Sequence, residues 1–299
     1  MLSDVQTDMT FLKYPVKKVT ESFLLDRKIK GLSPHSLKFY RLETNFFVEY
    51  TQQNNITYIE DITPLHLREF FVTLANRRNQ GGVHACYRAV RALFFFFEGE
   101  YEPPRYKNPI RKVSIKAVPP KPLPGISYDN IKILLSYCNN PQTTAIVYCL
   151  ANTGCRANEF LSLNVGDVDF ITGEVVINNG KGNKNRKTFM NREALKHLRN
   201  YLKSRKNTNP SSPLWVNRYG DRMNIQSLRL IINTLSEQAR IPHPKLHDFR
   251  RFFALQLLRS GVQVLVISLL LGHSSVEVTK RYLDINSEDL RLEHRKMLL

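Results

Sequence analysis

The sequence lacks the features that mark a membrane-spanning or a secreted protein. It has no run of about 18 apolar residues, which excludes a helix long enough to cross a bilayer. Its first residues carry acids and no apolar core, so no signal peptide is expected. Cysteine is scarce: Cys86, Cys138, Cys149 and Cys155 form no C-x-x-C pair and no cluster with zinc-ligand spacing. We therefore expect free, mostly buried thiols, a cytoplasmic chain, and neither a disulfide framework nor a bound metal.

Acidic residues are also few. Lys and Arg number 44 against 26 Asp and Glu, which leaves a net charge of +18. Such an excess indicates a polyanionic partner and says nothing about the fold. Because no basic amphipathic anchor stands out, nucleic acid is favoured over an anionic membrane surface. The length of 299 residues fits one or two domains, and 42% apolar residues suffice to bury a core.

The first third of the chain has a helical pattern. Ser33 and Thr63, each followed by proline, are typical of the residue that caps the start of a helix. Gly81 and Gly82 are expected to break the chain before a third helix. That helix contains the run 94–97, four consecutive phenylalanines, which predicts a core element or a contact face.

Residues 103–124 separate this region from the rest. The segment is rich in proline, has six Lys or Arg and no acid, and predicts an extended spacer. It is either a solvated linker or a strap on a phosphate backbone, and its one-sided charge favours the strap. The predicted parts are a helical DNA-binding domain (1–102), a basic linker (103–126), a catalytic domain (127–285) and a C-terminal tail (286–299).

The second domain mixes two patterns. Helical periodicity covers about 128–163, and β-branched residues with turn signals at 168–190 predict an antiparallel sheet of two or three strands. Helical periodicity then resumes at Arg192, with interruptions near 207–224 and 241–242. The predicted fold is mainly α, with a small antiparallel β-sheet in the C-terminal domain.

Four stretches of this domain present cations, or groups able to become cations, at turns or helix ends. A phosphodiester under nucleophilic attack gains negative charge in its transition state. Guanidinium groups bind this charge with forked hydrogen bonds. Stretches with these residues could bind such an anion, and a tyrosine follows that could attack it. They are TGCRANEF (Arg156), NGKGNKNRK (Lys181), LHDFRRFF (His247, Arg250) and LLGHSSVEVTKRY (His273, Tyr282).

Each residue also has a structural interpretation. Arg156 could equally form an ion pair with Glu159 one turn along the helix. A lysine between glycines is commonly a solvated hairpin residue, single histidines are commonly structural, and a single tyrosine commonly packs against a core. The order and spacing of the whole set favour chemistry over these alternatives.

In these residues the chain resembles the tyrosine recombinases, the lambda-integrase-like family that includes phage integrases and Xer resolvases. TGCR with Glu159 resembles the family's first arginine box, GKGNK its β-hairpin lysine, HDFR its H-x-x-R box and LGHS its L-G-H box, with Tyr282 where the nucleophile stands. Cys155 and Asn158 depart mildly from the first box. The resemblance covers nearly the whole chain and implies a two-domain DNA clamp of this type.

The resemblance implies that Tyr282 attacks a scissile phosphate to give a 3′-phosphotyrosine and a free 5′-hydroxyl, without cofactor, metal or ATP. Arg156, Arg250 and His273 would stabilise charge, Lys181 would protonate the leaving oxygen, and His247 would accept the tyrosine proton. Strand exchange would pass through a Holliday junction. A homotetramer on two core sites of double-stranded DNA, one dimer per site, is expected, in a prokaryotic cytoplasm near the nucleoid, with the tail exchanged between protomers or docked on its own domain.

Two other functions remain open at this point. A type IB topoisomerase or a telomere-resolving enzyme uses a similar residue set, and a DNA-binding regulator could retain the fold without activity. No arm-binding domain is expected before the first helix, which favours a simple core-site enzyme. The predicted DNA contacts are cations of the third helix, the linker and the hairpin: His84, Arg88, Arg91, Arg111, Lys112, Lys116, Lys184 and Arg186.

Overall fold

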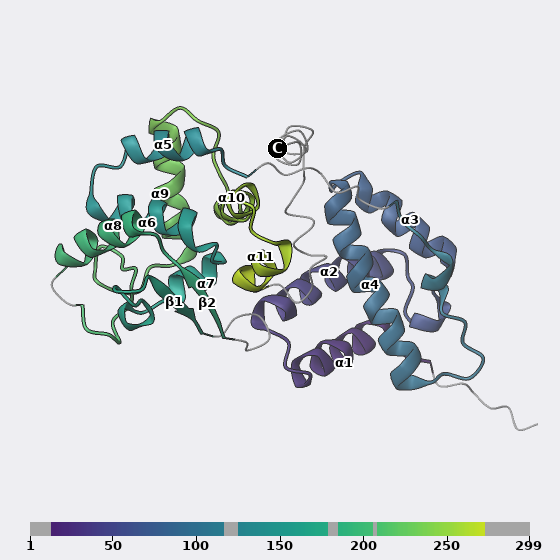
Figure 1. Cartoon of the computed structure of the whole chain (residues 1–299). Helices are drawn as coiled ribbons and strands as arrows, with labels where there is room; N and C mark the ends of the chain where they lie inside the picture. The colour runs from purple at the N-terminus through teal and green to yellow at the C-terminus, as the bar shows by residue number, and fades with distance from the viewer. Residues whose placement is uncertain (1–12, 117–124, 179–184, 206–207, 273–299) are drawn as a thin grey trace, which may run out of the picture. The chain divides into compact units, whose positions relative to one another are not determined.

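The computed structural model describes residues 13–116, 125–178, 185–205 and 208–272 (Figure 1). The chain divides into two compact units, Met1–Pro120 and Lys121–Leu299. The division falls inside the linker that the sequence predicts at 103–126. None of the described helices is both long and apolar enough to cross a membrane.

The regular elements described in the first unit are all helices. Two short 3-10 helices, η1 (Ile59–Asp61) and η2 (Pro109–Lys112), accompany its α-helices. The α-helices are α1 (Val16–Ile29), α2 (Pro34–Gln53), α3 (Pro64–Ala75) and α4 (Gln80–Tyr101). Helix α4 contacts α1, α2 and α3, so the core of this unit is built around it. Within the phenylalanine run, Phe94 and Phe97 are fully buried, which confirms the run as a core element.

The predicted helix starts are confirmed at two positions and corrected at a third. The Ser33 hydroxyl accepts a hydrogen bond from the Ser36 amide at 3.2 Å, and Thr63 caps α3 in the same way. The expected break at Gly81 and Gly82 is wrong, because α4 already begins at residue 80. The Asn79 side chain accepts from the Gly82 amide at 2.9 Å and caps the helix, so both glycines lie in its first turn.

The first half of the predicted linker packs on the first unit. Ile110 and Val113 are 1% and 5% exposed and belong to its core. An extended spacer is therefore wrong for these residues, because their apolar side chains anchor the segment. Residues 117–124, the last part of the predicted strap, lie outside the described residues.

The second unit combines helices with one small sheet, as the sequence predicts (Figure 1). Strands β1 (Glu174–Ile177) and β2 (Arg186–Phe189) pair antiparallel, with Glu174 opposite Phe189. The 3-10 helix η3 (Val165–Asp167) precedes β1. Its α-helices are α5 (Tyr128–Ser136), α6 (Pro141–Thr153), α7 (Ala157–Ser162), α8 (Arg192–Lys203), α9 (Ile225–Gln238), α10 (Leu246–Arg259) and α11 (Val264–Leu271).

Helix α6 lies at the centre of this unit. It contacts α5, α8, α10 and β2, and its residues Ala145, Ile146 and Val147 are fully buried. The core also includes Trp215, whose ring stacks between Phe160 and Tyr201 with centroid distances of 4.6 Å and 5.6 Å. Trp215 thus joins α7 to α8, while α6 packs directly on α10, the helix that carries the HDFR box.

The cysteines are free, as the sequence predicts. Cys86, Cys149 and Cys155 are buried and Cys138 is partly buried. Burial raises the pKa of Cys86 to about 12 and raises the pKa of the other three thiols as well. They therefore stay protonated at neutral pH and act as small apolar side chains.

Candidate active site

Arg156 stands at a sharp turn between two helices. Helix α6 ends at Gly154, whose φ of 59° is in the left-handed region that favours glycine, and α7 begins directly after Arg156. A Cβ at position 154 would lie 2.4 Å from the ring of Phe253, so the turn also needs glycine for space. The turn brings Arg156 to the surface, where 32% of its side chain stays exposed.

The ion pair that the sequence left open for Arg156 is formed. Its Nη1 donates to Glu159 at 2.7 Å, and its backbone amide donates to the other carboxylate oxygen at 2.8 Å. The second amino group, Nη2, donates to the carbonyl of Gly272 at 3.2 Å. Arg156 is therefore held in a fixed direction while part of its side chain still faces solvent.

His247 and Arg250 lie within the first two turns of α10. Arg250 is 1% exposed, and its amino groups donate to the carbonyls of Gly154 and Leu271, each at 2.7 Å. His247 instead reaches the surface one turn earlier. The helix thus carries one cation that is buried against the Arg156 turn and one ring that is open to solvent.

Three arginines surround the Glu159 carboxylate. Arg186 donates to it at 2.6 Å and Arg250 lies 4.0 Å away, in addition to Arg156. Burial alone would raise the pKa of Glu159, but Arg186 and Arg156 outweigh that effect and hold its pKa below the usual value. Three positive charges against one negative charge leave the cluster with an excess of two. A poorly solvated cationic excess of this kind favours a bound anion such as a phosphate.

The electrostatics at His247 favour a neutral ring. Partial burial lowers its pKa below 6.5, and the positive charges of Arg250, Arg251 and Arg156 lower it further. At neutral pH the imidazole is therefore unprotonated, and a neutral imidazole can accept a proton.

A hollow of about 590 Å³ opens beside His247. It lies between α9 and the segment that leads into α10, with Arg229, Asn233, His243 and Lys245 around it. The sequence did not single out these residues, because they come from two segments, α9 and residues 243–247, that only the folded chain brings together. Their polar and basic side chains extend the cationic character of the site beyond the predicted residues.

Four of the predicted site residues lie outside the described residues: Lys181, Lys184, His273 and Tyr282. The structure does show where α11 ends. Its last helical residue is Leu271, and Gly272 caps it with a φ of 64°. His273 is the next residue in the chain after this cap.

Arg186, predicted to contact DNA, is buried instead. Its side chain is 9% exposed, and its amino groups donate to Glu159 and to the carbonyl of Leu270. A guanidinium used in this way is not available to a DNA groove, so the predicted contact is withdrawn.

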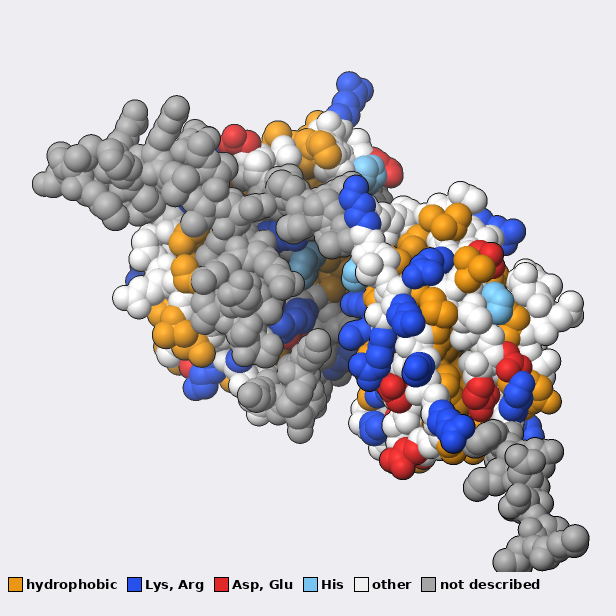
Figure 2. All heavy atoms as spheres, turned by 90° about the vertical axis from the view of Figure 1, so that its right-hand side faces the viewer, with side chains coloured by type: hydrophobic (Ala, Val, Ile, Leu, Met, Phe, Trp, Pro, Cys, Tyr) orange, Lys and Arg blue, Asp and Glu red, His pale blue; other side chains and the backbone are white. Residues whose placement is uncertain are grey.

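Six of the predicted DNA contacts lie in the first unit. Figure 2 shows lysine and arginine side chains along one margin of this unit. Arg88 and Arg91 are exposed on one face of α4, with His84 partly exposed one turn before Arg88. The guanidiniums of Arg91, on α4, and Arg111, on η2, lie 4.9 Å and 4.7 Å from the ring of Phe95, and Arg111 also donates to Glu98 at 2.9 Å.

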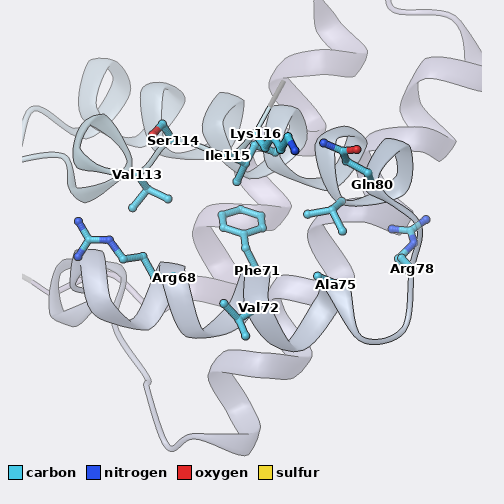
Figure 3. A pocket seen from close by; sticks show the side chains of 11 residues that line it. Arg68, Phe71, Val72, Ala75, Arg78, Gln80, Val113, Ser114, Ile115 and Lys116 are labelled. Atoms are coloured by element: carbon cyan, nitrogen blue, oxygen red, sulfur yellow. The ribbon is translucent and has the colours of Figure 1, made fainter. Parts of the chain in front are cut away.

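The other two predicted linker contacts, Lys112 and Lys116, are both exposed. Lys116 borders a hollow of about 570 Å³ between α3 and the segment Val113–Lys116 (Figure 3). Phe71 and Val72 give this hollow an apolar lining, with Arg68 at its rim. The hollow differs in character from the cationic site of the second unit.

Comparison with known proteins relates both units to one group. Residues 126–289 match the phage integrase family. The chain is 26% identical over 281 residues to tyrosine recombinase XerC of Oceanobacillus iheyensis, covering 89% of this chain and 91% of the relative. It is 29% identical over 292 residues to XerA of Thermococcus kodakarensis, covering 94% and 96%. The crystal structure of XerH bound to its difH substrate, a pre-cleavage complex, has the same fold, with a TM-score of 0.74 at 18% identity and coverage of 94% and 97%.

Proposed function

The chain belongs to the phage integrase family of tyrosine recombinases, which break and rejoin DNA, and on this premise we propose that it recombines specific DNA sites through a covalent tyrosine intermediate. One observation carries the proposal. Arg156 and Arg250 meet at the end of α11, directly before His273, although Arg156 and Gly272 are 116 residues apart in the chain. Packing thus assembles three separate sequence boxes at one place.

In the proposed reaction, the hydroxyl of Tyr282 attacks the scissile phosphate. A bond forms between its oxygen and phosphorus, and the bond from phosphorus to the 5′-oxygen breaks. His247 takes the tyrosine proton, which its lowered pKa supports, and Lys181 gives a proton to the departing 5′-oxygen. The phosphotyrosine conserves the energy of the phosphodiester, so the rejoining step needs neither ATP nor metal.

The arginine cluster suits the charge that develops in this step. A phosphodiester carries one negative charge, and attack by a tyrosinate raises it to two. The cationic excess of two around Glu159 matches this charge, and Arg156 and Arg250 would stabilise the phosphorane together with His273. The site would therefore bind the transition state more strongly than the starting phosphate.

Strand exchange would follow when the free 5′-hydroxyl of a partner strand attacks the phosphotyrosine, which gives a Holliday junction. We propose four protomers on two sites, with a dimer on each and residues 286–299 exchanged between neighbours. Both units of each protomer would contact the duplex, the first through His84, Arg88, Arg91, Arg111, Lys112 and Lys116. The paired cations around Phe95 support this surface.

The target can be identified by selecting bound duplexes from a random library, and the function can then be tested on plasmids. A plasmid with two copies of the selected site should be resolved into two circles or inverted between the sites. A supercoiled plasmid without the site should stay supercoiled. Rapid relaxation of the site-free plasmid, with no recombinant product from the other, would instead indicate a type IB topoisomerase.

A further inference from the structure

The C-terminal end of α11 rests on three arginines. The carbonyls of Leu270, Leu271 and Gly272 lie in the last turn, where a helix leaves its carbonyls without partners and carries partial negative charge. Each of the three carbonyls accepts from a different side chain: Arg186 at 3.0 Å, Arg250 at 2.7 Å and Arg156 at 3.2 Å. The backbone immediately before His273 is therefore fixed by cations from three other elements.

Arg186, like Arg156, uses one guanidinium to bond both the end of α11 and the Glu159 carboxylate, but its side chain is much less exposed, at 9% against 32%. Its Nη1 donates to Leu270 and its Nη2 to Glu159, while its aliphatic stem lies against Gly272. A Cβ added to Gly272 would lie 2.4 Å from the Arg186 Cδ, so the side chain and the helix cap are in close contact. Arg186 thus links β2 to the end of α11, and its other hydrogen bond links both to the carboxylate that directs Arg156.

We propose that Arg186 is a positioning residue that acts through His273 and Arg156 without touching DNA. Its two amino groups fix the C-terminal end of α11, from which the chain continues to His273. They also hold the Glu159 carboxylate in the orientation that directs Arg156. The proposal rests on the proposed function, because His273 and Arg156 are assigned to the phosphate there. It replaces the DNA contact that the sequence predicted for Arg186.

The geometry requires arginine. A guanidinium presents two amino groups in a fixed fork, so one side chain can bond a carbonyl and a carboxylate at once. Lysine retains the charge but has a single ammonium, and methionine has similar length without charge or donors. Arg186→Lys should therefore retain part of the effect, and Arg186→Met should lose it.

The test uses the full-length chain and two readouts. The first is the rate of covalent complex formation on a nicked substrate at saturating protein, with DNA affinity measured separately. Arg186→Met should slow cleavage by about 100-fold, the loss that a misplacement of about 1 Å can cause, with DNA affinity within about twofold of wild type. The cleavage rate of Arg186→Lys should lie between those of wild type and Arg186→Met. Lys187→Met, on the exposed side of the same strand, should cleave at the wild-type rate.

A double-variant cycle shows whether Arg186 acts through His273. If it does, Arg186→Met should slow a His273→Ala enzyme by much less than 100-fold, because the positioned group is already missing. Full multiplication of the two losses would overturn the proposal. Loss of DNA affinity with a normal cleavage rate would also overturn it, because Arg186 would then be a DNA contact.

The second readout does not depend on activity. Amide hydrogen exchange at the C-terminal end of α11 should be faster in Arg186→Met than in wild type or Lys187→Met, without DNA. Unchanged exchange there would refute the positioning role even if the wild-type protein cleaved no DNA. Absence of covalent DNA with wild type, together with faster exchange in the variant, would refute the proposed function alone.

Discussion

Glu159→Gln tests the electrostatic reasoning about the site. The substitution keeps the shape of the side chain and an oxygen that can accept from the Arg156 amide. It removes the negative charge that lies 2.7 Å from Arg156 and 2.6 Å from Arg186. Because Glu159 is 7% exposed, water cannot replace the lost partner, and the arginines are left with an excess of three charges.

The expected loss of stability is large. Removing one partner of a buried ion pair costs about 3–5 kcal/mol. A domain of roughly 150–250 residues loses about 2–4 °C of Tm for each kcal/mol, so the second unit should unfold about 6–20 °C earlier. The lowered pKa of Glu159 means that its charge stabilises the fold at neutral pH and that this stabilisation is lost as pH falls through the folded-state pKa. The difference from wild type should therefore shrink in acid.

Thermal unfolding followed by circular dichroism at pH 7 measures the effect. Glu193→Gln is a matched control, because that carboxylate is 57% exposed and lies 3.6 Å from Lys196. An exposed pair contributes about 0–1 kcal/mol, so this control should unfold within a few degrees of wild type. Equal Tm values for the two variants would refute the account of the buried cluster.

Three further predictions concern cleavage, DNA binding and recombination. The cleavage rate should increase with pH and reach its plateau at a lower pH than a histidine of ordinary pKa would give, because the pKa of His247 is lowered. An unchanged pH profile in His247→Gln would show that His247 is not the base. Arg91→Ala and Arg111→Ala should each weaken DNA binding and lower the slope of log affinity against log salt by about 0.9, and an unchanged slope would exclude a phosphate contact. Deleting residues 286–299 should spare binding to one site and impair recombination between two, whereas normal recombination would show that the tail is passive.

The helix starts were predictable where the sequence carries a local signal. Ser33 and Thr63 cap their helices through their own side chains, so neighbouring residues suffice to identify them. Helix α1 was not predicted, because Pro15 before it makes no side-chain cap. The error at Gly81 has a different origin, since a side-chain cap is present there: the cap formed by Asn79 outweighs the low helix propensity of two glycines.

The site was predictable in its residue types and not in its packing. The boxes identify Arg156, His247 and Arg250, yet no sequence pattern shows that Arg250 is buried against Gly154. Arg186 illustrates the limit. Alternation along β2 places Arg186 on the same face as Thr188, but only the packed structure shows that this face is the buried one.

The central claim is that Tyr282 forms a covalent bond to DNA. The most direct measurement uses a selected site with a nick close to the scissile phosphate, so that the short 5′-hydroxyl fragment diffuses away and the covalent complex accumulates. Wild-type protein should give a DNA adduct that survives denaturation and that peptide mass spectrometry places on Tyr282, while Tyr282→Phe binds the same DNA and gives none. An adduct on another residue, or an adduct that persists in Tyr282→Phe, would contradict the account.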